Sequence, residues 1–270
     1  MIYLGSLGRM IGIKSPAQQG VASDTRHRFD RSLEGRVKAQ VLPVGRRTWT
    51  LQTSAATTPT EYSTLEQFAS GAWGTGPFQF VSADAAITNL LTPDESLCMG
   101  DPIASYYSAG GPVDLGVGGW SARSWVHSDS SLAGEIYFQQ TPAPILPGVR
   151  VTGSAWIRGE GAKLRLYWYD SPFGNPIAGT VDSGPLTIFD GWTRVTVIGD
   201  PPEGAIGVRV VAQYADFATM PAITWTKQAK PWGSGQGCSK AVVSQLERSQ
   251  VRANEVSNLS RVSFAVTEVG

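Results

Sequence analysis

The chain has 270 residues, of which 41% are hydrophobic and 16% charged, and its 22 basic residues balance its 22 acidic ones. A length of this order allows about two domains with sizeable cores. The balanced charge argues against a nucleic-acid-binding protein that works by neutralising phosphates. No apolar run reaches the roughly 18 residues that a membrane helix needs, so we expect no membrane insertion.

The charge is unevenly distributed along the chain. Residues 1–47 carry nine Lys or Arg against three Asp or Glu, whereas residues 48–146 carry nine acids against Arg123 alone. Opposite charges on two parts of a subunit favour a head-to-tail contact between copies, the type of contact that closes rings. Neutralisation within one subunit explains the pattern equally well. For the densest basic group we favour a solvated loop over a surface that meets DNA; it comprises Arg26, His27, Arg28, Arg31 and Arg36.

The N-terminal segment predicts short strands. MIYLGSLGRMIGIKSP lacks a basic start and has Arg9 within its apolar part, so it does not fit a secretory signal, and we expect assembly in the cytoplasm. Apolar and polar residues alternate in 35–44 and again in 48–53. Such alternation predicts half-buried strands.

A capped helix, a turn and an aromatic strand are predicted between Tyr62 and Ser96. Ser63 and Glu66 have the spacing of a capping box, which predicts a helix from about Thr64 to Ser70 with Gly71 as its C-cap. WGTGP at 73–77 then turns the chain into a strand in which Phe78 and Phe80 share one side.

The amino-acid sequence of this stretch resembles the N-terminal module of phage distal tail proteins and of related minor tail proteins of actinobacterial phages. In those families a short helix precedes a G-x-x-PF-x-F strand, and an NLLTP-like connection follows, as in YSTLEQFASGAWGTGPFQFVSADAAITNLLTPDES here. The resemblance implies a virion protein of the tail tip, usually a hexameric ring around the end of the tail tube. The pattern alone would also fit a helix-turn-strand of any α+β domain.

The middle of the chain predicts an antiparallel sandwich. Short alternating segments separated by Gly and Pro turns are typical of this architecture, and Gly159-Glu160-Gly161 is expected to close a hairpin. The segments 149–170 and 191–211 resemble jelly rolls of carbohydrate-binding modules, over about 97–227. The predicted strands are 121–127, 134–140, 149–158, 162–170, 192–198, 206–214 and 222–226.

The C-terminal part is predicted to contain a flexible connection, a helix and a strand. The connection covers 227–240, and Ala241 to Val251 has a modest helical pattern. In SRVSFAVTEVG, Val262 and Phe264 alternate with polar residues, and we expect this strand to return to the N-terminal sheet. Exchange of the strand with a neighbouring subunit is the alternative.

The predicted fold is therefore mostly β: a small β-sandwich with one short helix, plus an inserted antiparallel jelly-roll β-sandwich. The expected domains are a discontinuous tail-assembly domain at 1–96 and 238–270, and the jelly roll with its linker at 97–237.

No motif predicts catalysis or a cofactor. His27 and His127 have no metal-ligand spacing, and GSGQGCSK at 233–240 lacks the GK pair of a phosphate loop. Cys98 and Cys238 fit no zinc set or redox motif; free thiols are the default, with a disulfide between them as the alternative. We therefore expect no enzyme, metal or cofactor.

Aromatic residues supply the candidate ligand-binding site. In 164–169, Leu164, Leu166 and Trp168 alternate with Arg165, Tyr167 and Tyr169. If Trp168 lies in the core, Tyr167, Tyr169 and Arg165 face outward, a combination suited to stacking on a sugar, and Trp120, Trp125 and Trp156 could join them. The alternation fits the opposite assignment, with Trp168 outward, equally well. The alternative is that these aromatics fill the core or a subunit interface.

The predicted function is that of a structural protein at the virion tail tip. Expected partners are further copies of the chain in a hexameric ring, the tail tube, tape-measure and hub proteins, and a host-envelope glycan. The alternatives are a carbohydrate-binding adhesion protein and, less favoured, a polysaccharide-degrading enzyme. The residues predicted to carry assembly are Phe68, Trp73, Phe78, Phe80, Val262 and Phe264.

Overall fold

The computed structural model confirms a mostly β, antiparallel fold. Two compact units divide the chain: the first contains Met1–Ile2, Gly12–Phe80 and Ser239–Gly270, and the second Tyr3–Ile11 and Val81–Cys238. The domain boundaries predicted from the sequence are near residues 97 and 238. The structure describes residues 1–14, 18–23, 27–31, 37–41, 46–54, 57–100, 103, 107–121, 123–127, 134–187, 191–253 and 258–269.

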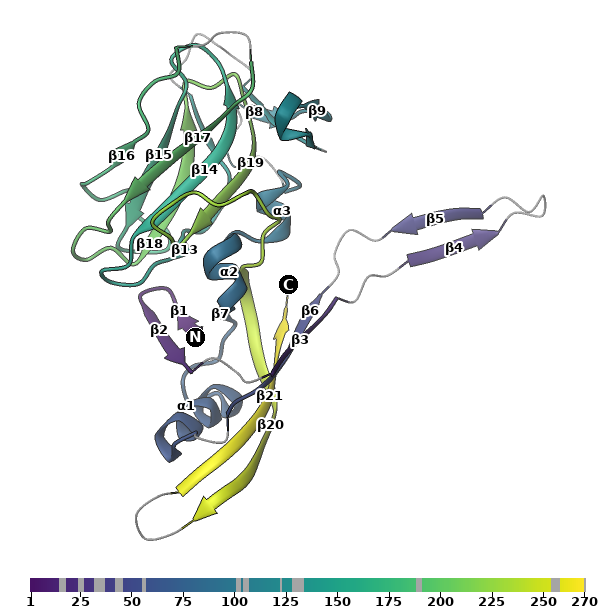
Figure 1. The fold of residues 1–270 in the computed structure, drawn as a ribbon, viewed down its shortest axis with the longest axis vertical. Helices are drawn as coiled ribbons and strands as arrows, with labels where there is room; N and C mark the ends of the chain where they lie inside the picture. The colour runs from purple at the N-terminus through teal and green to yellow at the C-terminus, as the bar shows by residue number, and fades with distance from the viewer. Residues whose placement is uncertain are drawn as a thin grey trace. The chain divides into compact units, whose positions relative to one another are not determined.

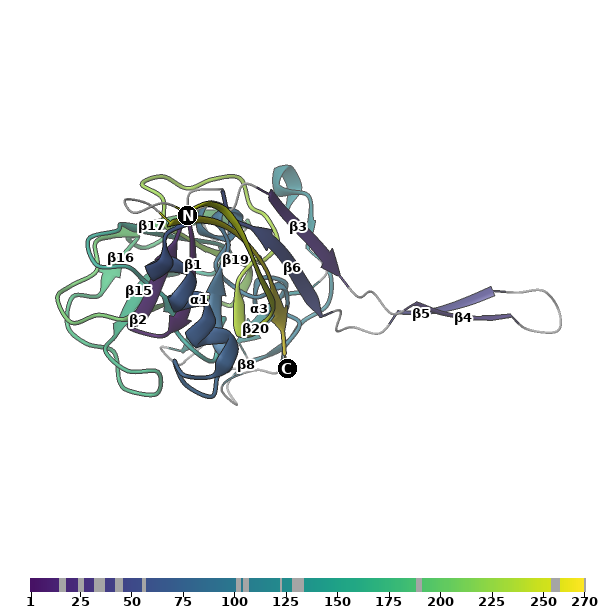
Figure 2. The same cartoon turned by 90° about the horizontal axis from the view of Figure 1, so that it is seen from below.

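The first unit is built on five strands of a seven-stranded sheet, which follow one another in the order β7-β20-β21-β6-β3 (Figures 1 and 2). The same sheet continues beyond β7 with β1 (Ile2–Ser6) and then β2 (Arg9–Ile13). β4 and β5 form a separate antiparallel pair. The elements are β3 (Gln18–Ser23), β4 (His27–Arg31), β5 (Val37–Val41), β6 (Arg47–Gln52), α1 (Pro59–Ser70), β7 (Phe78–Val81), β20 (Cys238–Ala253) and β21 (Asn258–Glu268).

The C-terminal strand β21 completes this sheet. It lies between β20 and β6, with Phe264 opposite Leu51 and Val266 opposite Trp49. The predicted return of the last strand to the N-terminal sheet is thus confirmed. A two-pronged ion pair fixes its end, because the Arg47 guanidinium donates through Nε and Nη2 to the Glu268 carboxylate at 2.9 Å each.

The helix predicted over Ala241 to Val251 is wrong, because this segment is part of strand β20. Its pairing with β21 shifts register between Ser244 and Glu247, and Gln245 has a left-handed φ of 53°. A bulge of this kind shifts the apolar residues out of simple alternation. The apolar residues of this segment therefore do not recur at every second position as in a regular strand, which is why the sequence suggested a helix.

Helix α1 begins earlier than predicted. Its capping box is formed by Thr58 and Glu61, with Pro59 in the first turn, and not by Ser63 and Glu66. Both pairs fit the same spacing, but a proline is pre-organised for the first helical position and sets the start here. Gly71 is the left-handed C-cap, as predicted.

The second unit is a sandwich of two five-stranded sheets, seen face to face in Figure 1, in the orders β17-β14-β19-β11-β8 and β12-β18-β15-β16 with β13 on β18. The remaining elements are β1 (Ile2–Ser6), β2 (Arg9–Ile13), α2 (Ala83–Thr88), α3 (Pro93–Ser96), β8 (Tyr107–Ala109), β9 (Val113–Asp114), η1 (Gly116–Gly118), β10 (Trp120–Ser121), β11 (Trp125–His127), β12 (Glu135–Tyr137), β13 (Ala143–Pro144), β14 (Val151–Arg158), β15 (Lys163–Tyr169), β16 (Val181–Asp182), β17 (Thr193–Gly199), β18 (Gly207–Gln213) and β19 (Phe217–Thr224).

The sandwich core fills the space between these sheets. Leu164, Leu166 and Trp168 of β15 are fully buried in it, and the Trp168 indole donates to the Gly179 carbonyl at 3.0 Å. The hairpin predicted at 159–161 is wrong: β14 pairs with β17 and β19, whereas β15 pairs with β16 and β18. The turn therefore carries the chain from one sheet to the other.

The segment predicted as a flexible connection, 227–240, packs against the NLLTP motif of the same unit. The Gln236 amide donates to the Asn89 carbonyl at 3.0 Å, and the Gly237 amide donates to that of Leu91 at 2.9 Å. A Cβ on Gly235 or Gly237 would collide with carbonyl oxygens of this motif. The glycines are thus required by a close approach of two backbones.

Candidate functional site

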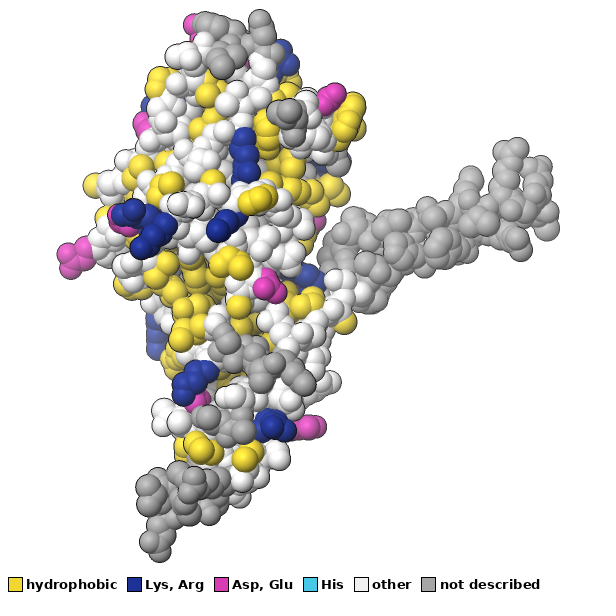
Figure 3. All heavy atoms as spheres, in the orientation of Figure 1, with side chains coloured by type: hydrophobic (Ala, Val, Ile, Leu, Met, Phe, Trp, Pro, Cys, Tyr) yellow, Lys and Arg dark blue, Asp and Glu magenta, His cyan; other side chains and the backbone are white. Residues whose placement is uncertain are grey.

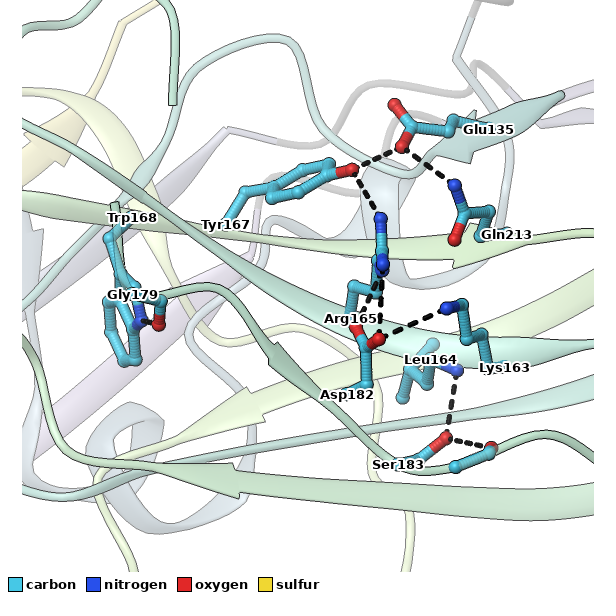
Figure 4. Close-up of polar contacts among 11 residues, drawn as sticks. Glu135, Lys163, Leu164, Arg165, Tyr167, Trp168, Gly179, Asp182, Ser183 and Gln213 are labelled. Carbon is cyan, nitrogen blue, oxygen red and sulfur yellow. Dashed lines mark hydrogen bonds and ion pairs between the residues drawn. The ribbon is translucent and has the colours of Figure 1, made fainter. Parts of the chain in front are cut away.

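A polar network lies on the outer side of β12, β15 and β18 (Figure 4). The Glu135 carboxylate accepts hydrogen bonds from the hydroxyls of Tyr137, at 2.6 Å, and Tyr167. Gln213 donates to the same carboxylate at 3.5 Å. Burial, together with this nearby carboxylate, raises the pKa of Tyr167 to about 12 and also raises that of Tyr137. The tyrosines therefore act as neutral donors.

Arg165 connects this network to β16. Its guanidinium donates to the Asp182 carboxylate at 2.5 and 3.0 Å and to the Tyr167 hydroxyl at 3.2 Å. Lys163 also donates to Asp182, at 3.0 Å. Hydrogen bonding from Arg165 holds the pKa of Asp182 below its usual range. The charges of this cluster thus neutralise one another.

The tyrosine rings are covered, so their predicted outward presentation is wrong. Tyr167 is only 9% exposed and Tyr169 only 1%, and both form a buried cluster with Val211. The Arg209 guanidinium lies 4.8 Å from the centre of the Tyr169 ring. A sugar has no open ring face to stack on here. Arg165 is brought together with the tyrosines, but as a partner in their internal network.

Trp125 belongs to a different part of the sandwich. It lies on β11 in the other sheet, is buried, and contacts Tyr107 edge to face at 5.5 Å. The predicted group of Tyr167, Tyr169, Arg165 and Trp125 is therefore not one surface. Trp125 serves the core, because its strand neighbours place it on the inner face of the sheet.

The residues predicted to carry assembly lie mostly inside the first unit. Phe78 and Phe80 are buried, as are Phe68, Val262 and Phe264. Phe68 packs on Phe78 at 4.9 Å and on Trp73 at 5.0 Å. Trp73 is half-buried. These side chains hold the subunit together, and a contact with a neighbour would need other residues.

Several other candidates fall outside any site. Both cysteines are buried free thiols, and burial raises the pKa of Cys98 to about 12. Among the described residues, no group of three His, Cys, Asp or Glu side chains could hold a metal ion, and no helix is long and apolar enough to cross a membrane. In the basic group, Arg26 and Arg36 lie outside the described residues, and only the backbone of β4 is described for His27, Arg28 and Arg31.

Sequence reasoning did not connect Glu135, Asp182 and Gln213 with Tyr167 and Arg165, although these three side chains complete the network. They come from three strands other than β15. Their proximity depends on which strands pair and in which register, for example Lys163 opposite Gln213. A single sequence carries no signal for that pairing.

Comparisons with known proteins give little help. No protein-family model matches the chain, and no curated protein matches it. Among solved structures, the CBM22-1–GH10 modules of endo-1,4-β-D-xylanase 10B from Clostridium thermocellum, complexed with xylohexaose, align with 47% of this chain and 26% of that one. The sequence identity is 13% and the TM-score 0.33, a likeness on which we build no argument.

Proposed function

We propose that this chain is a structural protein of a phage tail tip. In this proposal copies of the first unit form a hexameric ring at the end of the tail tube, in contact with tube, tape-measure and hub proteins. The second unit is carried on the ring. The role is one of assembly and display, without catalysis.

The construction of the first unit is the observation that carries the proposal. Its sheet is made from chain on both sides of the second unit, since β20 and β21 join β6 and β3. The stretch from Tyr62 to Ser96, whose sequence resembles distal tail proteins, supplies most of α1 and the strand β7.

The edge strand β3 offers a place for contact between copies. Among the described residues it pairs with β6 alone, and it ends the sheet. Its sequence QQGVAS contains no charge or proline, the usual protection of an edge. Val21 lies opposite the buried Trp49, so it extends that apolar face to the edge, where it is 52% exposed. A strand of the next subunit could add here.

A lysine at the edge tests this contact. Val21→Lys should convert the hexamer to monomers, because a charged edge resists strand addition, while the unfolding temperature stays within about 2 °C. Light scattering coupled to gel filtration measures the mass. Val251→Lys is the matched control: Val251 is 54% exposed but lies on β20, which β21 and β6 separate from the edge strand β3, so the ring should persist. A hexamer in Val21→Lys, or equal loss in both variants, would rule out the β3 contact.

A carbohydrate-binding adhesion role remains the second candidate. The predicted stacking residues do not support it, since Tyr167 and Tyr169 are covered. The other face of the sandwich offers a better surface.

A further inference from the structure

The outer face of β14 combines an aromatic and a basic side chain. Ala155 and Ile157 of this strand point into the sandwich core. Trp156 and Arg158 alternate with them and therefore lie on the outer face, where both are partly exposed. Gly118 approaches the Trp156 indole so closely that a Cβ there would collide with it. This packing fixes the ring in place.

Strand register brings further residues of the same kind to this face. Arg194 of β17 lies opposite Trp156, and Phe217 of β19 lies opposite Arg158. The Trp192 ring contacts Phe217 at a centroid distance of 6.1 Å. We call these five residues the aromatic–guanidinium face. Figure 3 shows basic side chains among hydrophobic ones over the region of β14, β17 and β19.

The two guanidiniums of this face have no acidic partner among the described residues. Arg158 lies over the Phe217 ring at 5.5 Å. Arg194 donates through Nη2 to the Ser154 hydroxyl at 3.2 Å and to the Lys230 carbonyl. Burial without a compensating charge lowers the pKa of Arg194. On the opposite sheet, by contrast, Arg165 is neutralised by Asp182.

We propose that the aromatic–guanidinium face binds an anionic saccharide. Arg158 and Arg194 are diagonal neighbours on paired strands, which places the two residues about 7–8 Å apart and their Cβ atoms somewhat closer. Long side chains at this separation can both reach one carboxylate or phosphate group. The sugar ring then stacks on Trp192, whose side chain is partly exposed.

The small number of charges favours a saccharide over a nucleic acid. Binding to a nucleic-acid strand relies on a basic groove that follows many phosphates. This face offers two guanidiniums beside aromatic rings, which suits a polymer with one acidic group for each sugar. The face contains no residue of β3 or of the rest of the first unit, so its binding is measured separately from ring formation.

The test measures saccharide binding by the full chain in calorimetry. The acidic probes are an oligogalacturonate, which carries carboxylates, and an oligomer of glycerol phosphate with attached glucose, which carries phosphates. Neutral cellohexaose and the nucleic acid oligothymidylate are the comparison probes. We expect one acidic probe to bind at least about tenfold more tightly than cellohexaose, with an affinity that falls as salt rises. Which acidic probe binds distinguishes a carboxylate from a phosphate ligand.

Substitutions locate the site. Arg158→Ala, Arg194→Ala and Trp192→Ala should each weaken binding about tenfold, because charged hydrogen bonds and stacked rings contribute this much. Arg150→Ala is the control: this arginine is exposed and paired with Asp200, so its loss should not change the affinity. If Arg194→Ala fails to fold, Arg158→Ala decides, since the Arg158 guanidinium packs over the Phe217 ring and makes no hydrogen bond with a described residue.

Four results would overturn the proposal. They are no binding of either acidic probe at millimolar concentration, equal binding of cellohexaose, equal weakening by Arg150→Ala, and tighter binding of oligothymidylate than of both saccharides.

Discussion

Asn89 is the most fully bonded buried side chain at the point where the chain enters and leaves the second unit. Its amide nitrogen donates to the carbonyls of Pro221, at 3.0 Å, and Gly233, at 3.1 Å. Its oxygen accepts from the amides of Leu91, at 3.2 Å, and Ile223, at 3.1 Å. One side chain thus ties together the NLLTP motif, β19 and the glycine-rich exit segment.

Asn89→Ala should lower the free energy of unfolding by about 3–5 kcal/mol, because it removes four hydrogen bonds and leaves the amides of Leu91 and Ile223 and the carbonyl of Gly233 without this partner. The Pro221 carbonyl keeps its hydrogen bond from the Trp232 indole. Urea unfolding followed by tryptophan fluorescence measures the change. The exposed Asn175 provides the control, and Asn175→Ala should stay within about 0.5 kcal/mol of the parent. A loss below about 1 kcal/mol for Asn89→Ala would contradict this account.

Glu95 predicts a pH dependence. Burial raises its pKa from 4.5 to about 7, against hydrogen bonds from Thr92. Between these two values the folded protein keeps a proton that the unfolded chain releases, so stability falls as pH rises from about 4.5 to about 7. Glu95→Gln keeps the capping geometry and removes the charge. The unfolding temperature of this variant should therefore fall less between pH 5 and pH 8, by calorimetry.

The equivalent residue of the first unit gives the contrast. Burial opposes ionisation of Glu61, but hydrogen bonds from Thr58 and the charge of Lys14 outweigh it and lower its pKa. Its contribution is present above the unfolded value and is lost as pH falls through the folded value. Glu61→Gln should leave the decline between pH 5 and pH 8 unchanged. An equal effect of both substitutions on that decline would contradict the assignment to Glu95.

At the level of single residues, the sequence predicted inward or outward direction better than exposure. Alternation correctly put Leu164, Leu166 and Trp168 on one side of β15 but left open which side is the core, and the structure places these three residues in the core. It could not show that Tyr167 and Tyr169 on the other side are covered, because the covering groups Glu135 and Arg209 come from other strands. Burial of an outward-facing residue depends on its cross-strand neighbours.

At the level of elements, a local sequence signal predicted the end of an element correctly where it had no competing signal nearby. Gly71 ended α1 as predicted. Two capping-box spacings competed at the start of that helix, and Pro59 favoured the earlier one. In β20 the bulge at Gln245 disturbed the strand period, and pairing with β21 determined the structure. Tertiary pairing here overrode a weak helical pattern.

The exit segment Trp232–Gly237 predicts a strict requirement for glycine. Gly235→Ala should lower the unfolding temperature by at least about 4 °C, because the new Cβ would overlap the carbonyl oxygens of Leu91 and Thr92. Scanning calorimetry measures it. The adjacent exposed Ser234 is the control, and Ser234→Ala should have little effect. An unchanged Gly235→Ala protein would mean that the two backbones do not approach as described.

For the whole molecule, the sequence predicted the β class and the return of the last strand to the N-terminal sheet. The alternation of Val262, Phe264 and Val266 was enough to predict this return, since a half-buried strand needs partner strands for its backbone hydrogen bonds. The sequence could not identify the binding surface. Arg158 is distant in the chain from Trp192 and Arg194, and it becomes their neighbour only through the register of β14 with β17.

Assembly into a ring is the central claim of this account. Electron microscopy of the purified full chain, with the mass measured by light scattering, tests it most directly. We predict rings with six copies of the subunit, lost in Val21→Lys and retained in Val251→Lys. A monodisperse monomer at all concentrations, which never joins a tail when mixed with tail-tube and hub proteins, would contradict the claim.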